Sequence, residues 1–206
     1  LPLAMTPEQV NVAAVIPIIG EFSQKSEQAH QFKKVVHELK NSQFVNSIYC
    51  LAQNKKLAES VDVKYLDRNS INNADSLSLN QILMYSLQII ESQGDFPDSI
   101  LYVNYDYISR PEGIFNKLIT DAQYKGCDTL FPGLIDYGHY WYYDDEQYNQ
   151  TDPSLNPREK RDPLYKALYG QGCISAAWTI RKGQMVGGKV GILKFSDSKY
   201  GQRITK

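Results

Sequence analysis

The residue types and spacings best suited to chemistry lie in two segments of this chain. The first, residues 100–110 (ILYVNYDYISR), predicts a buried strand over 100–103 that stops at a polar triplet containing Asp106. Ligands of open α/β sheets bind at the carboxyl ends of strands. A carboxylate oxygen there would face the phosphates of a nucleotide through Mg²⁺, which makes Asp106 the best single candidate for a metal ligand. An aspartate that only caps a turn or a helix is an equally simple alternative.

The second segment, residues 158–191, is basic and rich in glycine. Clusters of cations commonly bind phosphoanions, although a solvated run of charge is the commoner explanation. The cations are Arg158, Lys160, Arg161 and Lys166. The glycines would let the backbone approach a ligand closely or would serve turns. They are Gly170, Gly172, Gly187, Gly188 and Gly191.

Other kinds of active site are not indicated by the sequence. The three histidines, His30, His37 and His139, have no metal-ligand spacing and no nearby serine or cysteine partner, so hydrolase chemistry has no support. Neither GxGxxG nor GxxxxGK[ST] occurs, which argues against a standard dinucleotide-binding turn and a P-loop. The three cysteines are far apart and lack CxxC spacing, which fits buried thiols in a reducing compartment and no structural zinc.

Length and composition predict a single domain over residues 1–206. Lys and Arg number 22 against 23 for Asp and Glu, so no overall field favours nucleic acid or an anionic membrane. The sequence has no apolar run near the roughly 20 residues needed to span a bilayer, and its first ten residues do not resemble a secretory signal. We therefore expect a cytoplasmic protein that binds neither nucleic acid nor membranes.

Apolar periodicity predicts alternating strands and helices. We expect strands over residues 10–19, 46–51, 63–66, 100–103, 129–131, 172–180 and 190–195, helices over 26–39, 77–90 and 113–125, and a short helix or turn at 55–61. Gly126 is a typical helix stop. This order implies right-handed crossovers and a three-layer αβα domain, in the α/β class, with a mostly parallel sheet.

Residues 137–148 (YGHYWYYDDEQY) differ from the rest of the chain because they concentrate five tyrosines, a tryptophan and three acids. An aromatic stripe of this kind is more often an outlying strand or a dimer surface than a ligand cage. We therefore interpret residues 136–150 as a Tyr-rich insertion that serves dimerisation.

Taken in order, these pieces resemble the cytidylyltransferases that activate acidic sugars, the synthetases of CMP-sialic acid, CMP-pseudaminic acid and CMP-Kdo. The likeness spans almost the whole chain. The similar segments are residues 15–17 (VIP, the opening strand), 68–78 (RNSINNADSLS, the Arg-Pro…Asp…Ser segment), 103–106 (VNYD, for Val-Gln-Gly-Asp), 161–165 (RDPLY) with 172–174 (GCI, the sugar-side block), and 187–191 (GGKVG, for Gly-Lys-Ile-Gly).

The resemblance implies a nucleotide-diphospho-sugar transferase (Rossmann-like) fold. It also implies transfer of CMP from CTP to a nonulosonic or ulosonic acid with release of pyrophosphate, Mg²⁺ as cofactor on Asp106, a homodimer, and sugar activation for cell-surface polysaccharides. The implied nucleotide-binding residues are Pro17, Gly20, Lys25, Arg68 and Asn104. The implied sugar-binding residues are Arg161, Tyr165 and Gly172, and the implied catalytic residues are Lys25, Asp106 and Arg161.

Departures from the family pattern keep other functions open. Residues 18–25 (IIGEFSQK) are shorter than the family's basic, Gly-rich loop, lack its arginine and place Glu21 where triphosphate should lie, so this acid would repel CTP. After the last predicted strand, Asp197 is the one acid in place of an Asp-x-Asp metal site. One alternative is a degenerate family member that binds a nucleotide or sugar without turnover. Another is a nucleotide-sugar-dependent glycosyltransferase of related fold, with residues 104–106 replacing its Asp-x-Asp motif.

Overall fold

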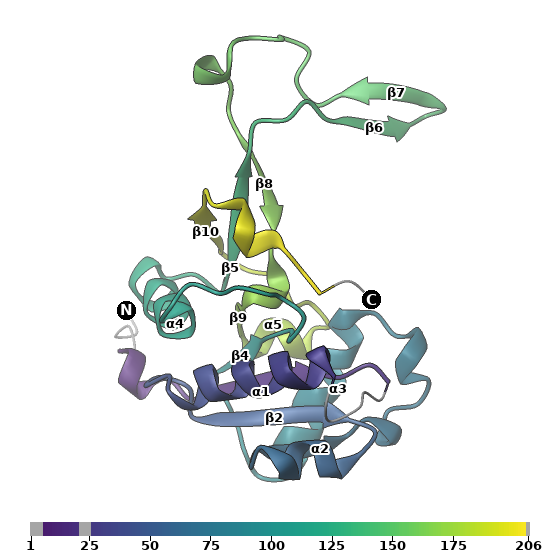
Figure 1. Ribbon diagram of the computed structural model, residues 1–206, viewed down its shortest axis with the longest axis vertical. Coiled ribbons are helices and arrows are strands. Elements are labelled where there is room, and N and C mark those ends of the chain that lie inside the picture. The colour runs from purple at the N-terminus through teal and green to yellow at the C-terminus, as the bar shows by residue number, and fades with distance from the viewer. Residues whose placement is uncertain (1–5, 21–25, 205–206) are drawn as a thin grey trace.

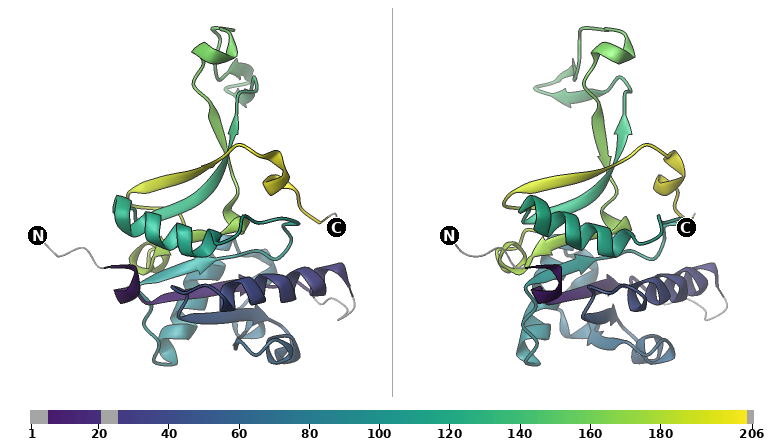
Figure 2. Two further views of the ribbon diagram at one scale, coloured as in Figure 1. Left: turned by 60° about the vertical axis from the view of Figure 1, so that its left-hand side comes forward. Right: turned by 90° about the vertical axis from the view of Figure 1, so that its left-hand side faces the viewer.

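The computed structural model describes residues 6–20 and 26–204, and in this part of the chain one eight-stranded mixed sheet is covered by helices on both faces (Figures 1 and 2). The strand order is β10-β5-β9-β4-β1-β2-β3, and β8 also pairs with β5. The strands are β1 (Val12–Pro17), β2 (Ser47–Ala52), β3 (Lys64–Asp67), β4 (Ser99–Tyr102), β5 (Thr129–Asp136), β8 (Leu164–Ala167), β9 (Cys173–Ala176) and β10 (Val190–Phe195). The helices are α1 (Glu27–Lys40), α2 (Lys55–Ser60), α3 (Leu79–Ser92), α4 (Ile114–Lys125) and α5 (Ala177–Arg181). The predicted three-layer α/β fold is confirmed.

β1 is buried on both faces because its side chains alternate between two hydrophobic cores. Ala14 and Ile16 pack in the core that contains α1 and α4, whereas Ala13 and Val15 pack in the core that contains α3 and α5. A central parallel strand covered by helices on both sides has this pattern. It explains why residues 10–19 are apolar without alternation.

Capping side chains set the starts of the two longest helices. Ser26 Oγ accepts a hydrogen bond from the Ala29 amide at 3.1 Å, and Ser78 forms a capping box with Gln81. The predicted stop at Gly126 is confirmed, since this glycine closes α4 in the left-handed conformation with φ +60°. Among the described residues, no helix is sufficiently long and apolar to cross a lipid bilayer.

Two predicted strands differ from the structure by more than two residues at one end. The strand expected over 172–180 is wrong from residue 177 onward, because β9 ends at Ala176 and α5 follows. The Ala177 amide donates to the Asp98 carbonyl at 2.8 Å, and α5 then buries Ala177 and Ile180 in the core shared with α3. The strand expected over 129–131 continues to Asp136, since β8, which the sequence pattern did not predict, pairs with its outer half.

The Tyr-rich segment forms a hairpin on an arm, residues 137–163 between β5 and β8, that extends away from the sheet (Figure 1). β6 (Trp141–Asp144) and β7 (Gln147–Gln150) pair through Asp145 and Glu146, whose φ values of +47° and +62° match a type I′ turn. The hairpin's large aromatic side chains are exposed; they are Trp141, Tyr142, Tyr143 and Tyr148. The prediction of outlying strands is confirmed, and dimerisation stays a prediction.

A polar cluster lies at the edge of the sheet where the parallel strands β1 to β4 begin. The Tyr49 hydroxyl donates to Asp95 Oδ2 at 2.6 Å, Asn11 Nδ2 donates to Asp95 Oδ1 at 3.3 Å, and Lys64 lies 3.8 Å from the carboxylate. Burial by itself would raise the pKa of Asp95, but the hydrogen bonds and the lysine outweigh it, so the pKa lies below its usual value. This cluster stabilises the fold without any part in the site described below.

Tyr49→Phe should therefore lower the free energy of unfolding by about 1.5–3 kcal/mol at pH 7, because a bond to a charged acceptor is lost. The native pKa of Asp95 is depressed, so its contribution is present above the unfolded value of about 4 and is lost as pH falls through the native value. Urea unfolding at pH 7 and pH 3 should show the difference between variant and wild type shrinking in acid. Tyr124→Phe, on a ring that is 92% exposed, is the matched control and should change little. A pH-independent difference would contradict the assignment.

Candidate functional site

The segments that follow β1, β2, β3 and β4 meet at one edge of the sheet because these four strands run parallel. β2 and β3 lie on one side of β1 and β4 lies on the other, so the chain switches direction between β1 and β4. Ligands of open α/β sheets bind at such a switch point, outside the carboxyl ends of the strands. The edge is therefore the first place to look for a site.

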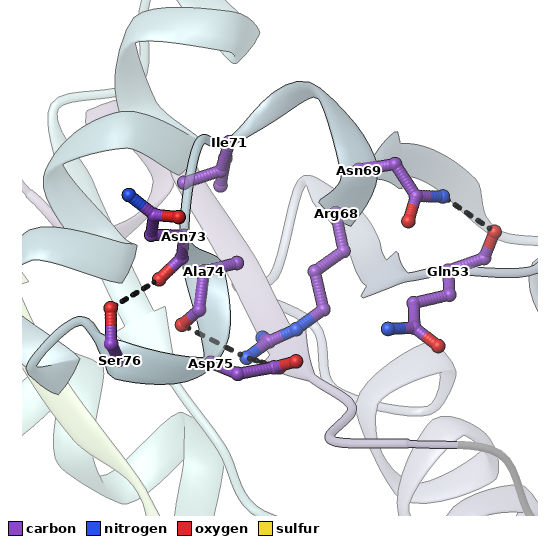
Figure 3. Close-up of a pocket in the computed structure, with 8 residues that line it drawn as sticks. All are labelled: Gln53, Arg68, Asn69, Ile71, Asn73, Ala74, Asp75 and Ser76. Carbon is purple, nitrogen blue, oxygen red and sulfur yellow. Dashed lines mark hydrogen bonds and ion pairs between the residues drawn. The ribbon is translucent and has the colours of Figure 1, made fainter.

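A cavity of about 380 Å³ opens at this edge beyond β2 and β3 (Figure 3). Its lining is mostly polar and comprises Gln53, Arg68, Asn69, Ile71, Asn73, Ala74, Asp75 and Ser76. Arg68 is only 3% exposed, and its Nη2 donates to the Ala74 carbonyl and to Asp75 Oδ1, both at 3.3 Å. Its Nε is buried and meets no hydrogen-bond partner among the described residues. A buried cation beside several amide groups suits a polar, planar ligand with nearby negative charge.

The nucleotide-binding residues predicted from the sequence are brought together in part. Pro17 ends β1, Arg68 follows β3 and Asn104 follows β4, all at the same edge. Gly20 lies three residues beyond β1 with φ +71°, a conformation that favours glycine. Lys25, and Glu21 with it, lie outside the described residues.

Asp106 is buried in the loop that follows β4. Asn104 Oδ1 accepts a hydrogen bond from the Asp106 amide at 3.2 Å, which folds the loop into a tight turn. Asp106 is 5% exposed, and its Oδ2 accepts from Arg203 Nε at 2.9 Å and also contacts Arg203 Nη2. The ion pair raises the pKa of Arg203 above its usual value. Sequence analysis did not single out Arg203; its basic character in the last few residues was the one available signal.

As arranged, these residues do not fit a bound Mg²⁺ at Asp106. One carboxylate oxygen is bonded to a guanidinium, and the other is sealed from solvent without a hydrogen-bond partner in the described chain. Residues 6–20 and 26–204 contain no group of three or more His, Cys, Asp or Glu side chains placed to hold a metal ion. At the position predicted for Mg²⁺, the structure therefore has a single carboxylate, and that carboxylate already has a cationic partner.

Arg110, which sequence analysis also missed, clamps the β4 loop to the turn before β9. Its guanidinium donates to the carbonyls of Asn104, Gly170 at 3.1 Å and Gln171 at 3.4 Å. Burial lowers the pKa of Arg110 to about 10. Gln171 completes the clamp, because its amide donates to the carbonyls of Ser109 at 2.7 Å and Tyr200 at 2.6 Å.

Of the predicted sugar-binding residues, Gly172 lies at this edge, in the turn before β9, whereas Arg161 and Tyr165 lie away from it. Arg161 belongs to the arm, between Lys160 and β8, where its Nη1 lies 3.2 Å from His139 Nε2. Tyr165 lies on β8, opposite Ile135. Gly172 packs inside the domain, since a Cβ there would lie 2.7 Å from Leu118 of α4. The sugar-binding assignments remain predictions. For Arg161 to reach this edge, the arm would have to come from a second copy of the chain.

No protein-family model and no curated protein sequence matches this chain. Among solved structures, CMP:2-keto-3-deoxy-manno-octonic acid synthetase complexed with CTP is similar with a TM-score of 0.63 and 8% identity, over 94% of this chain and 92% of that one. The 4-diphosphocytidyl-2C-methyl-D-erythritol synthase from Anaerococcus prevotii DSM 20548 has a TM-score of 0.63 and 11% identity, over 96% and 91%. A second structure of a 4-diphosphocytidyl-2C-methyl-D-erythritol synthase has a TM-score of 0.62 and 10% identity, over 96% and 94%.

We expect Arg110→Met to lower the free energy of unfolding by about 2–4 kcal/mol, because carbonyls of the clamp lose a donor inside the protein. Arg181→Met is the matched control: it breaks an exposed ion pair with Glu91 and should cost less than about 1 kcal/mol. Urea denaturation of the two variants measures the difference. Equal effects would show that the clamp does not hold the loop.

Proposed function

We propose that this protein, which has the fold of the cytidylyltransferases, transfers CMP from CTP to an acidic sugar and releases pyrophosphate. The observation that carries the proposal is the arrangement at the carboxyl edge. A polar pocket with the buried Arg68 lies beyond β2 and β3, and the loop with Asp106 lies beyond β4, so that β1 separates them. The likeness to a structure solved with CTP supports the same assignment.

The pocket suits a cytosine and its ribose. Its volume of about 380 Å³ lies in the range of small-molecule sites, and the amides of Gln53, Asn69 and Asn73 offer both donors and acceptors. Arg68 lines the pocket, and its guanidinium would offset negative charge on the ligand. Asp75, whose side chain is 74% exposed, keeps the guanidinium in place from the other side.

The triphosphate would then run past the end of β1 toward the β4 loop. In the reaction a sugar hydroxyl attacks the α-phosphorus, the bond to the β-phosphate oxygen breaks, and pyrophosphate leaves. Catalysis of phosphoryl and nucleotidyl transfer depends mainly on positioning and on cations that offset the growing charge. Arg203 lies beside the β4 loop, where it would supply one such cation. Lys25 is proposed as the second.

The acidic sugar would be held by the arm of a second copy. A cavity of about 420 Å³ on the arm is lined in part by Lys160 and Arg161, cations that suit a sugar carboxylate. Because the arm points away from the sheet of its own chain, Arg161 would serve the site of a partner (Figure 1). The exposed aromatic hairpin is the surface on which we propose that the homodimer forms.

A protein that binds nucleotide without turnover is the second candidate. The ion pair between Asp106 and Arg203 favours it, because the acid proposed for catalysis is already neutralised. Turnover and binding measured on the same protein separate the two functions.

Incubation with CTP, Mg²⁺ and a panel of nonulosonic and ulosonic acids should release pyrophosphate with at least one of them. Arg68→Met should raise the KM for CTP by about tenfold or more, since a charge-assisted hydrogen bond is lost. Lys56→Met, on the exposed surface of α2, is the control and should behave as wild type. CTP binding without pyrophosphate release would favour the second candidate, and no binding of CTP would refute both.

Trp141→Ser combined with Tyr143→Ser should weaken self-association by at least about tenfold, because buried aromatic anchors dominate interfaces. Analytical ultracentrifugation measures this directly. Tyr124→Ser, on the exposed face of α4, is the control and should leave the sedimentation unchanged. A monomeric wild-type protein would contradict the proposed dimer.

A further inference from the structure

Arg203 binds the side of Asp106 that a metal ion would need. Its Nε donates to Oδ2 at 2.9 Å, and its Nη2 contacts the same oxygen. The pair is charge-assisted and joins groups 97 residues apart. The carboxylate is only 7% exposed at its side chain, so it has little other solvation. The guanidinium is therefore the counter-ion of Asp106.

The main chain fixes Arg203 in this position. The Ile108 amide donates to the Gln202 carbonyl at 3.1 Å, and the Ile204 amide donates to the Asp106 carbonyl at 2.8 Å. Tyr107 and Arg203 form an antiparallel bridge between these two bonds, and the guanidinium lies 5.2 Å from the Tyr107 ring centre. A short antiparallel ladder thus holds the Arg203 main chain beside the Asp106 loop, within reach of the carboxylate.

The rest of Asp106 gives a metal ion no access. Oδ1 is closed to solvent and meets no hydrogen-bond partner in the described chain, so a hydrated cation could not reach it without moving the loop. Mg²⁺ keeps several waters and needs near-octahedral space. A metal on Oδ2 would lie against a guanidinium of the same charge and would be repelled.

We infer that Arg203 takes the place of a divalent metal ion at Asp106. Its guanidinium offsets the negative charge of the carboxylate. Because the side chain is half exposed, the same guanidinium is the cation that this edge presents to the phosphates of a nucleotide. Arg110, which lies 5.8 Å from the Tyr107 ring, cannot do the same because three main-chain carbonyls hold it. The exclusion of metal stands on the contacts alone, whereas the role toward phosphates rests on the proposed function.

Binding of Mn²⁺ to the ligand-free full chain, followed by electron paramagnetic resonance, tests the exclusion of metal. Wild type and Asp106→Asn should bind Mn²⁺ equally weakly, because Asp106 is not available in either. Arg203→Gln should gain a site at least about tenfold tighter, and adding Asp106→Asn to it should remove the gain. Arg203→Lys retains the charge and should remain close to wild type, while Arg181→Gln controls for the loss of a surface cation.

Two results would overturn the replacement of a metal ion by Arg203. The first is a wild-type Mn²⁺ affinity that falls at least tenfold in Asp106→Asn, which would place metal on this carboxylate in the native protein. The second is an Arg203→Gln variant that retains native circular dichroism and gains no Mn²⁺ site, which would show that Arg203 is not the group that keeps metal from Asp106. Both results are independent of CTP, so they can be told apart from a failure of the proposed function.

Calorimetry with CTP tests the role toward phosphates. The wild-type affinity for CTP should change less than about threefold between excess EDTA and excess Mg²⁺. In Arg203→Gln, the affinity in EDTA should fall at least about tenfold, and Mg²⁺ should restore part of it. A wild type that binds CTP only with Mg²⁺, or an Arg203→Gln variant that binds CTP as wild type does in EDTA, would overturn this part.

Discussion

The arrangement of the site depends on one constraint: the loop after β4 is largely buried, so its main-chain polar groups must find hydrogen-bond partners inside the protein. Arg110 donates to carbonyls in the turn before β9, and Gln171 donates to the carbonyls of Ser109 and Tyr200. Buried main-chain groups without partners are costly, so such a clamp fixes the loop more firmly than apolar packing could. Gly170 allows the close approach, because a Cβ there would lie 2.6 Å from Tyr107 and 2.7 Å from Asn104. The position of Asp106 follows from these contacts.

The same clamp joins the site to the last part of the chain. Gln171 holds the Tyr200 carbonyl, and three residues later Arg203 meets Asp106. The β4 loop, the turn before β9 and residues 200–204 are thus parts of one hydrogen-bonded unit on the body of the domain. The arm is not part of it, because β5 and β8 carry the hairpin beyond the sheet (Figure 2). The proposed function therefore places the arm of a second copy over this edge.

The sequence predicted the sheet better than the site, for a physical reason. Strands such as residues 46–51 are recognisable because burial on both faces selects apolar residues locally, and β10 was predicted with its observed ends. The strand prediction was wrong for residues 177–180 because the helix that forms there begins with a hydrogen bond to Asp98, which lies far away in the sequence. The pair of Asp106 with Arg203 likewise has no local signature: an arginine near a chain end and an aspartate after a strand become partners only when the fold brings them together. Asp106 was therefore predicted as a metal ligand from its position after a strand and from the family resemblance, neither of which shows its partner.

An arginine differs from a metal ion as the cation of a phosphate site in a way that matters for this fold. A metal prefers several oxygen ligands, and the described residues contain no group of three or more His, Cys, Asp or Glu side chains placed to hold one. A guanidinium needs only one acceptor to be positioned, and its remaining N–H groups stay available to an anion. The cost is that the cation is attached to the chain. Any ligand that brings its own Mg²⁺ must either coexist with Arg203 or displace its side chain from Asp106, whereas the main-chain bonds between residues 106–108 and 202–204 do not involve that side chain.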